Sequence, residues 1–150
     1  MRKALILLVF IVSLASCGSA RKAQVLYYWG GESDGTTRYE RLAYNNFHRE
    51  TPQSVCDLVV LYEDLVKHPG GLCNKPAPGI CAEYGYLLLI PETASAFTEY
   101  ATSEQKAIFT SGDFVTYFRQ YGLELLQMEM EYYPEATTFI MPLLKKFSSR

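Results

Sequence analysis

The sequence predicts an all-α fold for residues 25–150. Apolar and aromatic residues recur at three- and four-residue steps in several segments, which is the spacing of one helix face. No segment alternates convincingly between apolar and polar residues, as a half-buried strand would. Proline and glycine lie between the periodic segments, where helices end. We therefore expect one domain of packed helices with an extended aromatic segment at its start.

The first half of this domain begins with the extended segment. Residues 25–31 are abruptly aromatic until a glycine pair ends them, and we expect them to pack across helices. Residues 38–49 carry apolar groups at helical spacing. Thr51 and Pro52 supply an N-cap followed by proline at the first helical position, so the next helix runs from Pro52 to Lys67. A Pro-Gly-Gly sequence then stops it.

The second half contains three further helical regions and an insertion. Residues 80–89 form a helix in which Gly85 allows close contact with a neighbouring helix. The insertion, residues 90–111, has two weak apolar patches and is expected to form one or two short helices. A long helix over 114–133 follows, which a proline ends, and a last helix is expected over 139–147.

The first 17 residues differ in composition from the rest. Two basic residues precede an apolar run over 4–12, and small residues follow it. This is the layout of a secretory signal peptide, and the run is short beside the roughly 20 residues of a transmembrane helix. Cys17 stands directly after Leu-Ala-Ser, and the tetrapeptide Leu-Ala-Ser-Cys resembles a bacterial lipobox. We expect residues 1–16 to be removed, Cys17 to carry lipid and residues 17–24 to form a tether. An ordinary signal peptide with an unmodified cysteine is the alternative.

The expected mature chain is acidic. Removal of 16 residues from 150 leaves 134. The removed segment holds two of the 14 basic residues and none of the 16 acidic ones, so 12 basic against 16 acidic residues give a formal charge of −4. No cluster of lysine and arginine remains, which argues against a nucleic-acid partner. Anionic head groups would not attract such a chain, so the acyl chains at Cys17 must hold it to the membrane.

Three further cysteines follow Cys17, an odd number in an oxidising compartment. Cys56 and Cys81 are expected near opposite ends of an antiparallel helix pair, whereas Cys73 lies in the intervening loop and can reach Cys81 more easily. We expect a Cys73–Cys81 disulfide, and three unpaired thiols are the alternative. His68 and these cysteines match no familiar zinc spacing, so no metal site is expected.

The second half also has the pattern of a tetratricopeptide unit. Small residues within 82–88 suit the contact of two antiparallel helices, a glycine-bearing turn lies at 112–114, and a proline follows the second helix within 133–135. We therefore expect a short tetratricopeptide-like antiparallel helical repeat. The insertion breaks the usual repeat period of about 34 residues.

These features together resemble a family of small bacterial lipoproteins with a tetratricopeptide-like domain. The resemblance lies in Cys17, the aromatic entry at 26–31, the block at 78–89 and the tail at 132–146. Members of this family are often encoded beside a lipoprotein related to the curli secretion pore. The resemblance implies an envelope protein partner and a part in an outer-membrane assembly. It brings no catalytic residues, and the insertion at 90–111 departs from it.

Candidate partner-binding residues fall in two places, and they are Tyr27, Tyr28, Trp29, Glu83 and Tyr84. The first three, which we call the aromatic strip, are either an exposed recognition surface or a segment docked into the helical groove. Glu83 and Tyr84 either line a concave partner groove or are a surface glutamate beside a core tyrosine.

No convergent acid, base and nucleophile can be assembled from the sequence, so we expect no enzymatic activity and no cofactor. Asp57, Glu63 and Asp64 fall on the outer faces of a helix and are expected to be solvated charges. We expect a non-enzymatic scaffold on the periplasmic face of the outer membrane that binds another envelope protein. A small module that binds a peptide or a glycan is the alternative.

Overall fold

The computed structural model describes residues 24–149, so the expected signal peptide, the lipidation site Cys17 and nearly all of the tether lie outside the described residues. The described chain is mostly helical, which confirms the all-α class. Its elements, in chain order, are β1 (Glu32–Ser33), β2 (Thr36–Thr37), α2 (Arg38–Arg49), α3 (Pro52–Lys67), α4 (Ile80–Leu89), α5 (Pro91–Tyr100), α6 (Ser103–Ala107), α7 (Phe114–Tyr132), η1 (Pro134–Ala136) and α8 (Thr137–Ser148).

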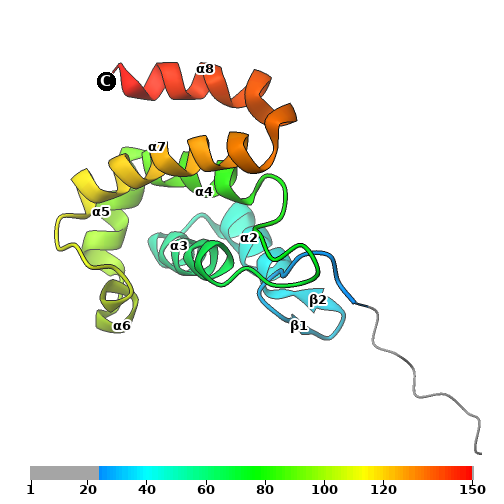
Figure 1. Cartoon of the computed structure of the whole chain (residues 1–150). Helices are drawn as coiled ribbons and strands as arrows, with labels where there is room; N and C mark the ends of the chain where they lie inside the picture. The colour runs from blue at the N-terminus through cyan, green and yellow to red at the C-terminus, as the bar shows by residue number, and fades with distance from the viewer. Residues whose placement is uncertain (1–23, 150) are drawn as a thin grey trace, which may run out of the picture.

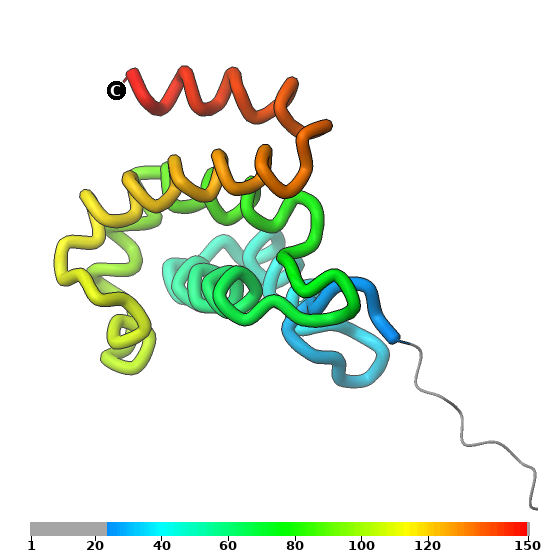
Figure 2. Tube along the Cα trace, viewed as in Figure 1, coloured from blue at the N-terminus to red at the C-terminus, as the bar shows by residue number. Residues whose placement is uncertain are grey.

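The helices are arranged around α4 and α7, which lie along each other. Figure 1 shows α8 on one side of this pair and α3 with α2 on the other. α5 contacts both α3 and α7, so it closes one end of the space between them. Where the described chain begins, the N-terminal segment runs beside the loop that joins α3 to α4 (Figure 2). The C-terminus of α8 lies at the opposite end of the molecule.

Local sequence signals place the helix starts. Thr51 accepts a hydrogen bond from the Ser54 backbone N–H in a reciprocal capping box, and Pro52 is the first residue of α3, as predicted. Thr37 and Glu40 form a second capping box at the start of α2. α8 begins earlier than expected, because η1 turns directly into it, and the helix continues through Pro142. Among the described residues, no helix is long and apolar enough to cross a membrane.

The contact between α4 and α7 is made by two glycines. A Cβ atom built on Gly85 would lie 2.8 Å from the backbone oxygen of Gly122, and one built on Gly122 would lie 2.8 Å from Cγ of Leu89. Real Cβ atoms essentially never approach so closely. The predicted close contact at Gly85 is therefore present, and its partner, Gly122, was not predicted.

The insertion between α4 and α7 is part of the core. Phe97 of α5 is fully buried, and its ring contacts the rings of Phe109, Phe114 and Phe118 with centroid distances of 5.0–5.3 Å. Aromatic side chains favour edge-to-face contacts of this kind, because the positive edge of one ring meets the negative face of the other. Residues 90–111 thus supply part of the hydrophobic core, through Phe97 and Phe109.

A short β-hairpin, whose strands β1 and β2 have two residues each, was not predicted. Asp34 and Gly35 form its turn, and both have positive φ angles, 56° and 73°. An Asp-Gly pair supports this turn because both of its central residues need a left-handed backbone. The strands are too short for their alternation to be recognised in the sequence.

Candidate functional site

A groove runs along the outer side of α3, between α2 and the α6 region. It consists of two adjoining pockets of about 590 and 480 Å³ that share Arg38 and Val60. We call this surface the α3 groove, and its lining residues are Arg38, Arg41, Leu42, Asp57, Val60, Glu63, Asp64, Lys67, His68, Gln105 and Ile108. Figure 1 shows α6 and the β-hairpin on opposite sides of α3.

Polar contacts across the α3 groove hold its walls. Nε2 of Gln105 donates a hydrogen bond of 2.9 Å to Oδ1 of Asp57, which links α6 to α3. At the other end, Arg38 of α2 lies 3.7 Å from the Asp64 carboxylate, and Nδ1 of His68 lies 3.1 Å from the same group. These side chains are partly solvent-exposed. An exposed ion pair such as Arg38–Asp64 contributes about 0–1 kcal/mol, so a ligand can exchange with it at small cost.

The floor of the α3 groove contains a buried carboxyl group. Glu63 is 5% exposed and accepts a hydrogen bond of 3.0 Å from the Tyr84 hydroxyl. Burial raises the pKa of Glu63 above its ordinary value. The Tyr121 hydroxyl is buried beside Glu63, and burial together with this carboxyl group raises the pKa of Tyr121. Nζ of Lys67 lies 5.2 Å from the Tyr121 ring centroid. The prediction that Glu63 is a solvated charge is therefore wrong.

Glu83 joins three helices. Its Oε2 atom accepts hydrogen bonds of 2.7 Å from the hydroxyls of Tyr39 in α2 and Tyr62 in α3. Burial together with this carboxylate raises the pKa of Tyr39 to about 12. Glu83 therefore braces α2 and α3 against α4. Tyr84, its neighbour, is 0% exposed, so of the two alternatives for this residue the structure has the core tyrosine.

The aromatic strip packs on the body of the protein, outside the α3 groove. Tyr27, Tyr28 and Trp29 are partly buried and rest against the main core. The Trp29 ring lies 5.1 Å from that of Tyr39, and the Tyr39 backbone N–H donates a 3.2 Å hydrogen bond to the Trp29 carbonyl. The strip is docked, yet each of its side chains keeps some exposed surface.

The expected Cys73–Cys81 disulfide is not formed. Cys81 of α4 lies in the hydrophobic core and is 0% exposed, whereas Cys73 is exposed in the loop before α4. The two thiols therefore lie in different environments. Cys56 is also free and buried, and burial raises its pKa to about 11 and that of Cys81 to about 12. Within residues 24–149, no group of three or more His, Cys, Asp and Glu side chains is placed to hold a metal ion.

Sequence reasoning did not identify the α3 groove, because its residues come from three segments far apart in the chain. Arg38, Val60 and Ile108 carry no motif. Glu63 did carry a signal: it lies four residues after Val59 and three before Val66, two core positions of α3. The chain matches no protein-family model, and the searches of the curated proteins and of the solved structures found no match either.

Proposed function

We propose that this protein is a lipid-anchored, non-enzymatic scaffold on the periplasmic face of the outer membrane, and that it holds another envelope protein in the α3 groove. The lipid anchor is Cys17, which follows Leu-Ala-Ser at the end of a signal-like segment. The resemblance described above suggests a secretion-pore-like lipoprotein as the partner. We also propose that α4 and α7, which make the most extensive contact between helices of the described chain, form a tetratricopeptide-like repeat unit.

The observation that carries this proposal is the composition of the α3 groove. Its base is apolar at Val60, its α6 wall presents Ile108, which is 46% exposed, and its rim is charged at Arg38, Asp64 and Lys67. An apolar centre inside a polar rim is the usual arrangement of a protein-binding surface. Helical assemblies commonly bind their partners on such concave faces.

The pairing of the charged groups supports binding and gives no support to catalysis. Asp64 is engaged by Arg38 and His68, and Asp57 by Gln105. A catalytic acid or base needs a free position within hydrogen-bond reach of a substrate. The side chains of this rim are already paired with one another, and a partner protein can replace these contacts with its own polar groups.

A second candidate function is the binding of a small peptide or glycan. It is favoured by the buried Glu63 carboxyl group, which lines the larger pocket, and by the Tyr121 hydroxyl beside it. A few polar groups at the base of a pocket can orient a ligand hydroxyl or amide.

Site-specific photo-crosslinking in native membranes tests the proposal. A photoreactive residue placed at Arg41 or Ile108, on the two walls of the α3 groove, should capture one envelope protein. The same residue at Lys145, exposed on α8, should not. Arg38→Glu should reduce capture from Ile108, whereas Lys145→Glu should leave it unchanged. Equal capture from Lys145 and from the groove, or none from the groove, contradicts the scaffold. A monomer that retains a small molecule in native mass spectrometry supports the second candidate.

A further inference from the structure

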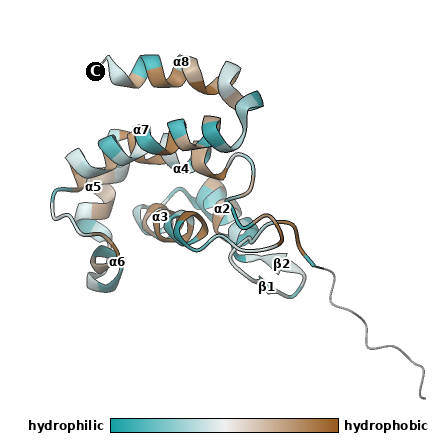
Figure 3. Cartoon of the chain, in the orientation of Figure 1, coloured by the Kyte–Doolittle hydropathy of each residue, from teal (hydrophilic) through white to brown (hydrophobic). Residues whose placement is uncertain are grey.

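The described chain begins at an exposed apolar patch. Val25, Leu26 and Leu72 are 58%, 59% and 60% exposed, although each is a large aliphatic residue. They lie together because the backbone N–H groups of Leu72 and Cys73 donate hydrogen bonds of 3.0 Å to the carbonyls of Val25 and Leu26. In Figure 3 the hydrophobic colour is visible where the described chain begins. We call Val25, Leu26 and Leu72 the N-terminal patch.

We propose that the N-terminal patch rests on the lipid bilayer beside the anchor, so that this end of the protein faces the membrane. This inference depends on the proposed lipid anchor and adds the face that contacts the membrane. Clustered aliphatic side chains at an accessible end of a domain suit shallow insertion among lipid head groups and the first methylene groups.

The patch is a fixed part of the fold. Gly71 has a φ angle of 75°, and a Cβ atom built on it would lie 2.6 Å from the carbonyl oxygen of Leu26. A Cβ on Gly70 would lie 3.1 Å from Cβ of Tyr28. The glycines therefore allow the segment that starts at Val25 to lie directly on the loop between α3 and α4. The aliphatic side chains are presented together as one surface.

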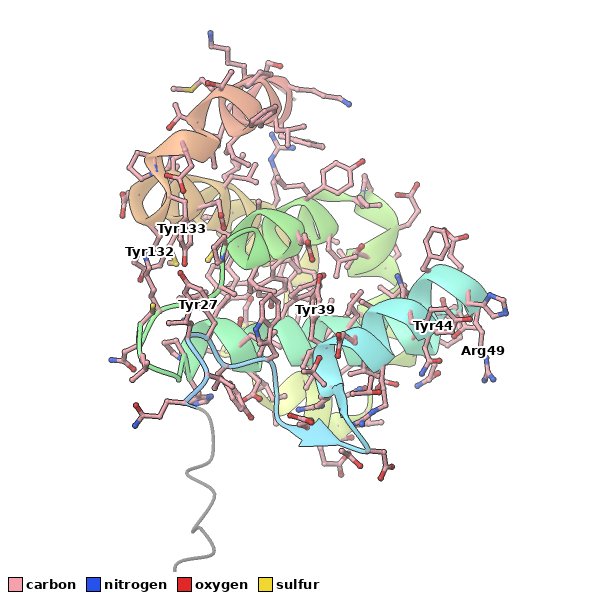
Figure 4. The ribbon with its side chains drawn as sticks, turned by 90° about the vertical axis from the view of Figure 1, so that its right-hand side faces the viewer. Tyr27, Tyr39, Tyr44, Arg49, Tyr132 and Tyr133 are labelled. Carbon is pink, nitrogen blue, oxygen red and sulfur yellow. The ribbon has the colours of Figure 1, made fainter. Side chains whose placement is uncertain are left out.

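The surroundings of the patch have the composition of a membrane interface. Figure 4 shows Tyr27 beside Tyr132 and Tyr133 at the end of the molecule where the chain enters. Nζ of Lys75 lies 4.2 Å from the Tyr133 ring centroid and donates a 3.2 Å hydrogen bond to the Tyr132 carbonyl. Tyr133 is buried and its hydroxyl donates a 2.7 Å hydrogen bond to the Pro76 carbonyl, so it fixes the loop, whereas Tyr132 is 39% exposed. Exposed tyrosines are enriched at the head-group level of membranes.

The position of the anchor selects the bilayer as the occupant of the patch. Gln24 follows Cys17 by 24 − 17 = 7 residues. Val25 is one residue further on, so at no more than about 3.6 Å per residue the start of the patch stays within roughly 29 Å of the lipidated residue. A tether this short holds the patch at a high local concentration near the membrane, whereas a protein partner would have to be recruited.

Cys73 offers a direct test, because it adjoins the patch and is exposed, whereas Cys56 and Cys81 are 0% exposed. A nitroxide label on Cys73 of the lipidated chain, reconstituted in phosphatidylcholine–phosphatidylethanolamine vesicles, should be relaxed more strongly by oxygen than by a water-soluble nickel chelate. The control is a label at Ser148→Cys in a Cys73→Ser background, at the exposed end of α8. It should show the opposite preference.

A double substitution refines the test. Leu26→Ser with Leu72→Ser should return the Cys73 label to the aqueous pattern, whereas Val115→Ser, at a residue 63% exposed on α7, should not. Mass and vesicle flotation of the same samples report the anchor separately. A lipidated, floating protein whose Cys73 label is as accessible to nickel as the Ser148 control overturns the membrane-facing patch and leaves the anchor intact. A protein without lipid on Cys17 overturns both.

Discussion

Replacement of Gly85 by alanine is expected to push α4 and α7 apart. The new Cβ would lie 2.8 Å from the Gly122 carbonyl oxygen and 3.2 Å from both Cβ of Leu125 and Cδ2 of Leu126. The oxygen belongs to a helix backbone, so it can retreat only if α7 moves. Overpacking of this kind costs about 1–3 kcal/mol. Alanine in a helix recovers about 1 kcal/mol relative to glycine. We expect a net loss of about 0–2 kcal/mol for Gly85→Ala, and a larger loss for Gly85→Leu, whose side chain meets the same atoms.

Urea unfolding followed by circular dichroism measures this loss as a lower midpoint at unchanged slope. Gly112→Ala is the matched control, because nothing lies within 4 Å of a Cβ built there and its φ angle is ordinary. Its free energy of unfolding should stay within about 0.5 kcal/mol of the wild type. If Gly85→Ala and Gly85→Leu unfold like Gly112→Ala, the close contact between α4 and α7 does not exist.

Three further substitutions test other parts of the structure. Glu63→Gln should remove a pH dependence: burial raises the pKa of Glu63 above its ordinary 4.5, so the wild type loses stability relative to the variant as pH rises through and above that value. Urea midpoints at pH 5 and pH 8 measure it, and a pH-independent difference would refute the assignment. Glu129→Ala should cost about 3 kcal/mol, because the 2%-exposed carboxylate accepts hydrogen bonds of 2.7 and 3.3 Å from the backbone N–H groups of Gly79 and Ala82. Exposed Glu131→Ala is its control in thermal unfolding, and equal melting temperatures would argue against the cap. Trp29→Ala should cost about 2 kcal/mol, roughly half the loss at a fully buried site, because the ring is only partly buried. A fully stable Trp29→Ala protein that no longer captures its partner would make the aromatic strip the binding site.

Helix starts were predictable because their signals are local. Thr51 and Pro52 need only their own sequence neighbours to cap and begin α3. Gly85 was recognisable because a small residue within an apolar helix indicates a close neighbour. The residue it meets, Gly122, lies 37 positions later (122 − 85), and a single sequence does not link the two.

The position of a charge was harder to predict than its helix. Asp57, Glu63 and Asp64 all belong to α3, yet only Glu63 is buried, because α4 and α7 place Tyr84 and Tyr121 beside it. The insertion, residues 90–111, was expected to form one or two short helices, and its part in the core was not predicted. Phe97 is a core residue only because α5 folds back between α3 and α7.

The sequence by itself determined the helical class and the bounds of α2, α3 and α4, because periodicity and caps act over a few neighbouring residues. The signal peptide and the lipid on Cys17 stay predictions. Only the tertiary structure decided the rest. The α3 groove needs Arg38, Val60 and Ile108 side by side, and the N-terminal patch needs Leu26 against Leu72. Both depend on how separate helices and loops pack, and packing free energy is set by contacts between residues distant in the chain.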